Sequence, residues 1–441
     1  MTGLTGVAPG TAVRARPRKA ERARDGVGLI TAYLCLLIAV PSRLVFKPLG
    51  AGGTPAALVA LFGLVAWIGA WMVPSRGVPH ARHQPVRWGL AMFSIAVLAS
   101  YLAGVTQFLP AGELRSADRG LIALAAWSGI VLMVADGIDS RERLELVLRR
   151  FVIAAAILAA IGILQFLTGF DITKLLKIPG LSENQPLALI NQRSSFRRVA
   201  GTASHPIEFG VVLAMALPVA LHCAFTAVQG RLWRWVAVAL IGAAIPMSLS
   251  RSAILGLLAA ALVLLPTWSP RRLAGAALLL PVFAVAMKGV APGLLGTIKS
   301  LFTGLQSDPS FQGRTEDYAV VGKFISQAPV FGRGFGTFNP GDYVLLDNQY
   351  LGTLIETGMV GLITLLLLFL IGIFTARGAR RRSNDPDFRD LGQSLAASVM
   401  VAMVSFVTFD AFAFPMATGT TFLVIGLAGA AWRVAVEAED D

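Results

Sequence analysis

Charge is scarce in this sequence of 441 residues, and cysteine is nearly absent. Charged residues make up 14% of the chain and hydrophobic residues 55%, whereas about a quarter of the residues of a soluble domain are charged. Cys35 and Cys223 both lie within apolar runs, so nothing supports a disulfide framework or a cysteine-ligated metal site. The polar segments also lack a serine-histidine-acid triad and a carboxylate-rich metal site. We therefore expect a membrane protein without a metal or another cofactor.

Apolar runs of nearly 20 residues recur along the chain. A helix of this length crosses the hydrocarbon core of a bilayer and satisfies its own backbone hydrogen bonds there. The sequence thus predicts an all-α, polytopic integral membrane protein with about twelve transmembrane helices. The predicted spans are residues 27–42, 54–73, 88–106, 120–137, 151–169, 206–226, 233–249, 252–266, 273–289, 350–376, 392–411 and 416–432.

The segments that flank and join the spans predict domains and topology. Residues 1–26 are basic and lack apolar periodicity, which predicts a disordered cytoplasmic tail before one membrane domain at 27–433. Residues 434–441 are expected to form a short, solvated acidic tail. Lys and Arg concentrate in the short loops on the side of both termini, so this side is expected to be cytoplasmic. The large loops at 170–205 and 290–349 are then extracytoplasmic.

The net charge of +13 does not indicate a nucleic-acid partner. The basic residues lie in clusters between apolar spans rather than on one amphipathic face. Their expected role is to orient the chain among the lipids of the cytoplasmic membrane.

Two of the predicted outer segments hold candidate site residues close to a span. Arg251 stands in SLSRSAILG, where almost no loop separates two spans. It is either an anion-binding arginine at the mouth of a cavity or a snorkelling arginine at the membrane boundary. His205 precedes Pro206 at the start of a span, downstream of Arg198. It is either a proton acceptor, because its ordinary pKa is near 6.5, or a structural hydrogen-bonding residue.

The predicted loop at 290–349 holds a further group of polar residues. Arg314 is followed by Glu316 and Asp317 at a spacing that also fits an intrahelical salt bridge. The segment PVFGRGFGTF, which contains Arg333, is expected to form a tight turn whose backbone donors face an anion. It lacks the Gly-Lys-Ser/Thr of a P-loop.

Asp347 and Asn348 lead into the span predicted at 350–376. An acid at a helix entrance is commonly an N-cap or a first-turn residue, which is the alternative to a chemical role for Asp347. Gly358 and Gly361, within the same span, are expected to permit close helix packing.

Five segments between residues 198 and 365 together resemble the O-antigen ligase and O-antigen polymerase superfamily of polytopic glycosyltransferases. In chain order they are RVAGTASHP, SLSRSA, GRTEDY, PVFGRGFGTF and DNQYLGTLIETGMVGL. The resemblance implies transfer of a glycan at the outer leaflet from an undecaprenyl-pyrophosphate donor to a saccharide or lipid-linked acceptor. It further implies that neither a nucleotide sugar nor a metal is required. Polymerase and ligase activities both remain open.

The resemblance also assigns candidate site residues. Arg198, Arg251 and Arg314 match family arginines, and arginine donates paired hydrogen bonds to phosphate oxygens. Asp347 stands where family members often have histidine, and Ile207 where they often have asparagine. On this basis Asp347 replaces the base that activates the acceptor, or the mechanism depends mainly on stabilising the leaving group. The predicted catalytic residues are Asp347, Arg314 and Arg251, and the predicted substrate-binding residues are Arg198, His205, Arg333 and Asn348.

A non-enzymatic transporter or flippase of lipid-linked saccharides is the competing class. A transporter would place charged groups and broken helices near the middle of its spans. Here the polar clusters fall at span ends, with Asp410 near an outer end and Asp136 near an inner one. No sequence repeat relates the two halves of the chain, so the enzyme is favoured.

Overall fold

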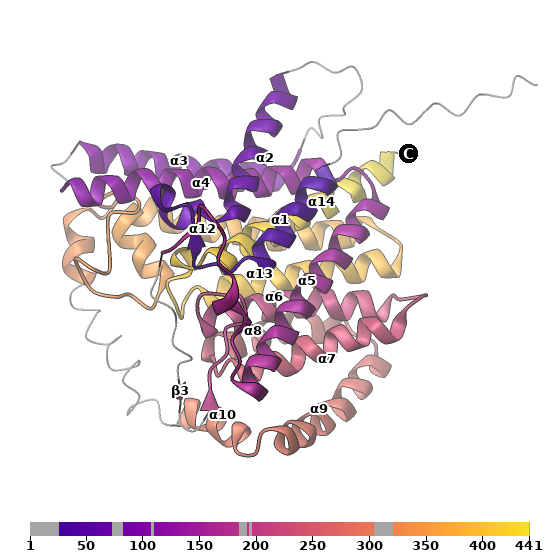
Figure 1. Cartoon of the computed structure of the whole chain (residues 1–441). Helices are drawn as coiled ribbons and strands as arrows, with labels where there is room; N and C mark the ends of the chain where they lie inside the picture. Colours follow the sequence, from indigo (N-terminus) through magenta and orange to yellow (C-terminus); the bar gives the residue numbers. More distant parts are fainter. Residues whose placement is uncertain are drawn as a thin grey trace, which may run out of the picture.

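A computed structural model shows a chain built almost entirely of helices (Figure 1). It describes residues 26–72, 83–106, 110–184, 192–193, 196–303 and 321–440. The long helices are α1 Gly26–Ala39, α2 Pro55–Met72, α3 Pro85–Val105, α4 Ala111–Gly137, α5 Arg141–Thr168, α6 Pro206–Phe225, α7 Arg231–Met247, α8 Arg251–Leu264, α9 Pro270–Val290, α10 Leu294–Thr303, α12 Gln349–Arg382, α13 Pro386–Ser405 and α14 Pro415–Asp440.

Short elements occupy the connections. The 3-10 helices are η1 Lys47–Gly53, η2 Ile172–Leu175, η3 Leu265–Thr267 and η5 Ala411–Ala413. Two antiparallel pairs join β1 Leu44–Val45 to β2 Ser182–Glu183 and β3 Gln192–Arg193 to β4 Phe196–Arg197. Residues 321–327 are also helical.

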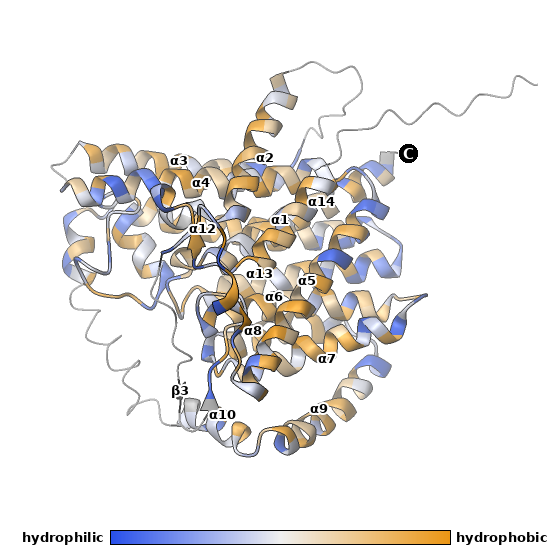
Figure 2. Cartoon of the chain, in the orientation of Figure 1, coloured by the Kyte–Doolittle hydropathy of each residue, from blue (hydrophilic) through white to orange (hydrophobic). Residues whose placement is uncertain are grey.

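Eight helices in the described part of the chain are long and apolar enough to cross a membrane, namely α2, α3, α4, α5, α6, α9, α12 and α14. α1 and the pair α8–η3 are apolar but shorter. Figure 2 shows hydrophobic residues along the helices and hydrophilic residues gathered toward their ends. The all-α polytopic membrane class is therefore confirmed. A helix lies in each of the twelve predicted ranges, but the count of twelve spans stays a prediction, because α1, α7, α8 and α13 are not among the eight helices that are both long and apolar enough.

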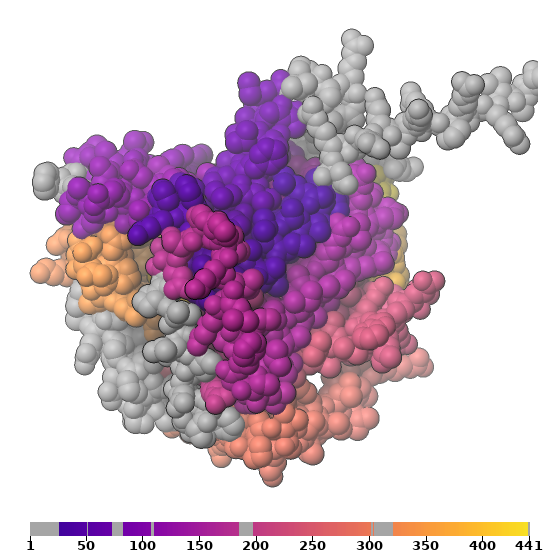
Figure 3. Space-filling model, in the orientation of Figure 1, coloured from indigo at the N-terminus to yellow at the C-terminus, as the bar shows by residue number. Residues whose placement is uncertain are grey.

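α6 and α14 form the centre of the packed helices. In each, 83% of the most apolar stretch is buried, compared with 6% in α9, which lies at the edge of the molecule (Figure 3). Glycines allow neighbouring helices to approach closely. A Cβ added at Gly129 of α4 would lie 2.0 Å from the carbonyl oxygen of Ala60 on α2, and one added at Gly162 of α5 would lie 2.3 Å from the ring of Phe209 on α6.

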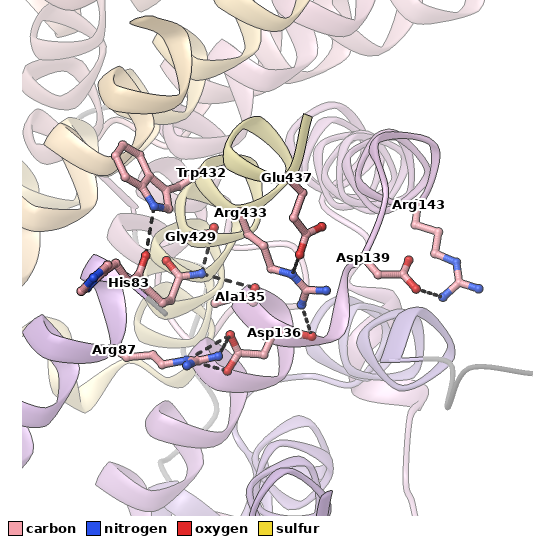
Figure 4. Close-up of polar contacts among 11 residues, drawn as sticks. His83, Arg87, Ala135, Asp136, Asp139, Arg143, Gly429, Trp432, Arg433 and Glu437 are labelled. Carbon is pink, nitrogen blue, oxygen red and sulfur yellow. Dashed lines mark hydrogen bonds and ion pairs between the residues drawn. The ribbon is translucent and has the colours of Figure 1, made fainter. Parts of the chain in front are cut away.

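Charged side chains join several helices at the end of the molecule that holds the C-terminus (Figure 4). Asp136 on α4 accepts hydrogen bonds from Arg87 on α3 (2.9 Å) and Trp67 on α2 (2.7 Å). Arg433 on α14 pairs with Glu437 (2.8 Å) and donates to the backbone carbonyl of Asp136 (2.6 Å). Asp136 is thus a structural anchor.

The structure describes the C-terminal segment of the chain but not the N-terminal one. The residues expected to form an acidic tail continue α14 as far as Asp440, where Glu439 pairs with Arg382 of α12. Residues 1–25, the body of the predicted basic tail, lie outside the described residues. The C-terminus and the connection at 321–347, drawn in orange, lie at opposite ends of the molecule (Figure 1).

Candidate functional site

The turn between α7 and α8 brings two of the predicted arginines together. The carbonyl oxygen of Ser248 accepts a hydrogen bond from Arg198 Nε (3.3 Å). Leu249 follows with φ of 49°, which makes it the one non-glycine residue with a positive φ in the described chain. Ser250 then caps α8, whose first residue is the half-buried Arg251. Such backbone conformations are costly and cluster at functional sites.

His205 lies beside these arginines at the start of α6. It is the N-cap of that helix, and its Nδ1 accepts a hydrogen bond from the backbone N–H of Ile207 (3.2 Å). Burial, followed by the neighbouring charge of Arg198, lowers the pKa of His205 to about 4. His205 is therefore neutral at pH 7, and its Nε2 carries the proton. This geometry favours the structural hydrogen-bonding role of His205. The nitrogen not used in the cap, Nε2, is then a donor rather than a proton acceptor.

Asn348, not Asp347, caps α12. The Asn348 Oδ1 accepts from the backbone N–H groups of Tyr350 (3.0 Å) and Leu351 (3.3 Å). The cap satisfies two of the free donors at the start of this helix. Asn348 thus has a structural role that explains its presence, whereas the half-buried carboxylate of Asp347 is not needed as the cap.

A second carboxylate, which the sequence analysis did not select, lies close to Asp347. Gln349 at the start of α12 binds the connection between α13 and α14 through its backbone N–H, which donates to Phe406 (2.9 Å), and its Oε1, which accepts from Phe412 N–H (2.7 Å). Asp410 lies in this connection. Burial, followed by the charge of Asp347, raises the pKa of Asp410 to about 7. The sequence signal was an acid in an otherwise apolar segment, FDAF.

Arg251 belongs to the same end of the molecule as these acids. α8 and α13 pack against each other, and a Cβ at Gly256 would lie 2.9 Å from Val401 and 3.2 Å from Ser405. Arg251 lies five residues before Gly256 on α8, which is about 7.5 Å along the helix. Because Ser405 is the last residue of α13, Arg251 lies level with the connection that contains Asp410.

Glu208 on α6 fixes the position of α14 at this end. One carboxylate oxygen accepts from the backbone N–H groups of Met416 (2.6 Å) and Ala417 (3.2 Å). The other accepts from Ser204 N–H (2.7 Å) and from the hydroxyls of Ser204 (2.8 Å) and Ser42 (3.2 Å). A buried carboxylate with five donors holds these segments in register. Glu208 was not among the predicted site residues, although an acid in the first turn of an apolar helix was a signal that could have indicated it.

Arg333 lies in a different set of contacts. Its guanidinium pairs with Glu113 of α4 (2.8 Å) and donates to the Tyr343 hydroxyl (2.7 Å). It also lies 4.5 Å from the centre of the Tyr343 ring. These contacts give Arg333 a structural role in joining the 321–347 connection to α4, and the predicted role in substrate binding has no support from them.

The backbone of PVFGRGFGTF likewise binds the protein itself. α12 is broken at Gly358, whose φ is 64°. The N–H groups of Arg333 and Gly334 donate to the carbonyl oxygens of Ile355 (3.1 Å) and Glu356 (3.0 Å), which the break leaves accessible. These two amides are therefore not directed at an anion, whereas the N–H of Phe338, at the end of the same segment, donates to Oε1 of Glu356 (3.1 Å), a carboxylate of the protein itself. Gly358 serves the break in the helix rather than the expected packing of one helix on another.

Arg314 and the rest of GRTEDY lie outside the described residues, so their predicted role stays a prediction. Among the residues that are described, no three His, Cys, Asp or Glu side chains gather as a metal site.

Residues 236–366 match the family model described as O-Antigen ligase. This part of the chain is similar to the O-antigen ligase family. The matched region begins in α7 and ends in α12, and it contains Arg251, Arg314, Arg333 and Asp347. The resemblance found in the sequence is thus confirmed, while Arg198, His205 and Asp410 lie outside the matched region.

A known protein supports the same relationship. An O-antigen polymerase from Salmonella muenchen is 27% identical over 218 residues, which cover 46% of this chain and 54% of that protein. The match thus spans about half the length of that relative. A chain of a solved structure titled "Structural coordination of polymerization and crosslinking by a peptidoglycan synthase complex" is 16% identical, with 85% of this chain and 98% of that chain covered. Its TM-score is 0.38, which does not establish a common fold.

Proposed function

We propose that this protein is a glycosyltransferase that polymerises or ligates undecaprenyl-pyrophosphate-linked saccharides. The observation that carries the proposal is the meeting of arginines and carboxylates at one end of the helices. Arg198 binds the turn that presents Arg251, and that turn lies level with Asp410, which is within electrostatic reach of Asp347. The similarity of the matched region to the O-antigen ligase family supports this class of reaction.

The arginines would hold the donor. Arg251 and Arg314, with Arg198 as a third member, bind the diphosphate and stabilise the charge that develops on it as it leaves. Arginine suits this role without a metal because its planar fork donates two hydrogen bonds to phosphate oxygens.

The carboxylates would serve the acceptor. The acceptor hydroxyl oxygen attacks the anomeric carbon of the donor sugar, and the bond from that carbon to the diphosphate oxygen breaks. The diphosphate leaves with the electron pair, and the hydroxyl proton passes to Asp347. Asp410 lies within electrostatic reach of Asp347 and would contribute to the field around the acceptor. Asp347 is thus the proposed base, and Asp410 is a neighbouring carboxyl that affects the electrostatics of the site.

The proposed membrane arrangement places this site on the outer face of the cytoplasmic membrane. Twelve spans at 27–433, cytoplasmic termini and outer loops at 170–205 and 290–349 agree with the distribution of Lys and Arg. The partners would be the lipid-linked donor, a saccharide or lipid-linked acceptor, and the surrounding lipids. The product would be a cell-surface polysaccharide or O-antigen.

The lipid-linked glycan that accumulates when the protein is removed tests this proposal. Single repeat units on undecaprenyl pyrophosphate would indicate a polymerase, and complete chains on the same carrier would indicate a ligase. Glycan trapped in the inner leaflet would contradict both activities and point to a flippase.

A further inference from the structure

A polar cavity of about 360 Å³ lies at the other end of the helices that carry the candidate site. Its walls come from the start of α5, the end of α6, the start of α7 and the start of α13. α6 has 20 residues and begins beside His205, so the cavity lies about 30 Å from the site, which equals the thickness of a bilayer core. The two features therefore belong to opposite membrane surfaces.

The charges in the cavity leave one arginine without a carboxylate. Glu145 on α5 accepts from Arg141 (3.1 Å) and from Arg149 (3.2 Å), and Arg141 also pairs with Asp385 before α13. Arg234 on α7, within the described chain, donates instead to the carbonyl oxygen of Cys223 (2.9 Å). Asp387, the other acid in the lining, is exposed.

Arg149 and Arg234 both line the cavity. The thiol of Cys223, also in the lining, lies within electrostatic reach of both guanidinium groups and of the carboxylate of Glu145. Two guanidinium groups in the wall of one polar space can supply the donors that bind a phosphate group.

Exposed apolar side chains lie on the segments that form the cavity, and one of them, Val228, is part of its lining. Val228, Leu232 and Trp233 are 95%, 73% and 75% exposed at the connection from α6 to α7. Leu146 and Ile153 are exposed on the neighbouring α5. Tryptophan is enriched where a membrane meets water. A basic cavity beside apolar, lipid-accessible helices fits a ligand that has a phosphate head and hydrocarbon tails.

We propose that this cavity binds the phosphate of a phospholipid headgroup in the leaflet opposite the candidate site. Basic pockets between transmembrane helices at the cytoplasmic side are known to take lipid headgroups. A bound lipid would join α5, α6, α7 and α13 at one end. Their other ends hold His205, the turn before Arg251 and the connection with Asp410. The proposal rests on the membrane placement and not on the reaction.

Binding of phosphatidylglycerol to the purified full chain in an uncharged detergent tests this inference. Native mass spectrometry over a lipid concentration series would give the affinity, with diacylglycerol as the ligand that keeps the tails and lacks the phosphate. We expect one phosphatidylglycerol to bind saturably, and Arg234→Gln to weaken it about tenfold or more, as for loss of a charge-assisted hydrogen bond. Arg231→Gln is the matched control, since Arg231 begins the same helix and does not line the cavity.

A variant that tightens binding distinguishes an effect on the binding site from a general loss of folding. Asp387→Asn removes a negative charge at the rim of the cavity and should increase the affinity for phosphatidylglycerol. Equal affinity of the native chain and Arg234→Gln, or equal binding of diacylglycerol, would overturn the proposal. Saturable binding of inorganic phosphate that displaces the lipid would instead assign the cavity to a soluble phosphate compound and reject the lipid.

Discussion

The residues that follow Asp347 take the structural roles at the start of α12. Asn348 takes the role of helix cap, and Gln349 binds the backbone on either side of Asp410. The sequence makes Asp347 a candidate, because it stands where members of the resembled family often have histidine, but the sequence did not single out Asp410. The position of Asp410 depends on contacts between residues that are some sixty positions apart, and no local pattern contains that information.

The buried carboxyl of Asp410 predicts a pH dependence of transfer. Burial and the charge of Asp347 raise the pKa of Asp410 to about 7, so Asp410 becomes ionised only as pH rises through that value. We expect kcat/KM to rise between pH 6 and 8, and Asp410→Asn to remove this limb because the variant lacks the group that titrates there. Rates measured across this range in proteoliposomes would check it. An unmoved limb in Asp410→Asn would show that another group is responsible.

Glu208 provides a prediction about stability. Glu208→Gln replaces a carboxylate oxygen by a donor that faces other donors, either those of Ser204 or those of Met416 and Ala417. Buried donors without acceptors cost about 1–3 kcal/mol each, so we expect a loss on the order of 3 kcal/mol. Thermal unfolding in detergent would measure it, with Glu142→Gln on the exposed face of α5 as the control. Equal melting temperatures for the two variants would refute the anchoring role.

At the scale of elements, the positions of the helices followed from apolar runs, because backbone in lipid must satisfy its own hydrogen bonds. The breaks within the helices did not follow from the apolar runs. Gly358 lies in a run that continues α12 without a break in hydropathy. At the break, the N–H groups of Arg333 and Gly334 donate to the carbonyl oxygens of Ile355 and Glu356, and the carbonyl oxygens of residues 329 and 330 accept from the N–H groups of residues 359 and 360. The sequence alone does not show that pairing.

The break predicts contrasting effects of two glycine substitutions in α12. Gly358→Ala places a Cβ 2.3 Å from the carbonyl oxygen of Val330, at a positive φ. We expect it to destabilise the protein by about 3 kcal/mol or more and to release the 321–347 connection. Gly352→Ala, where the nearest atom is 3.7 Å away, should be neutral or stabilising. Melting temperatures of both variants would decide the matter, and tolerance of alanine at 358 would exclude a strained break.

At the scale of the whole molecule, the membrane class and the similarity to the O-antigen ligase family could be predicted from composition and motif order. The twelve spans and the orientation depend on boundaries that helix length alone does not define, as α7 and α13 illustrate. The Lys and Arg residues at the helix ends predict the orientation of the chain, and that orientation can be tested.

Single cysteines in a chain without Cys35 and Cys223 would test the orientation. We expect a membrane-impermeant thiol reagent added to intact cells to label Lys177→Cys and Gly341→Cys, in the outer loops. Asn384→Cys, between α12 and α13, should react only after the cells are opened. All three positions are exposed, so accessibility reports the side of the membrane. Labelling of position 384 in intact cells would reverse the proposed topology.

The rate of glycan transfer from a purified undecaprenyl-pyrophosphate donor, with EDTA present, tests the central claim most directly. Arg251→Lys keeps the charge and loses the planar fork, so transfer should fall about ten- to a hundredfold. Arg231→Lys, at the opposite end of the same pair of helices, should transfer at the normal rate at equal levels of inserted protein. Full turnover by Arg251→Lys, or transfer only when a divalent metal is supplied, would contradict an arginine-bound diphosphate as the basis of the reaction.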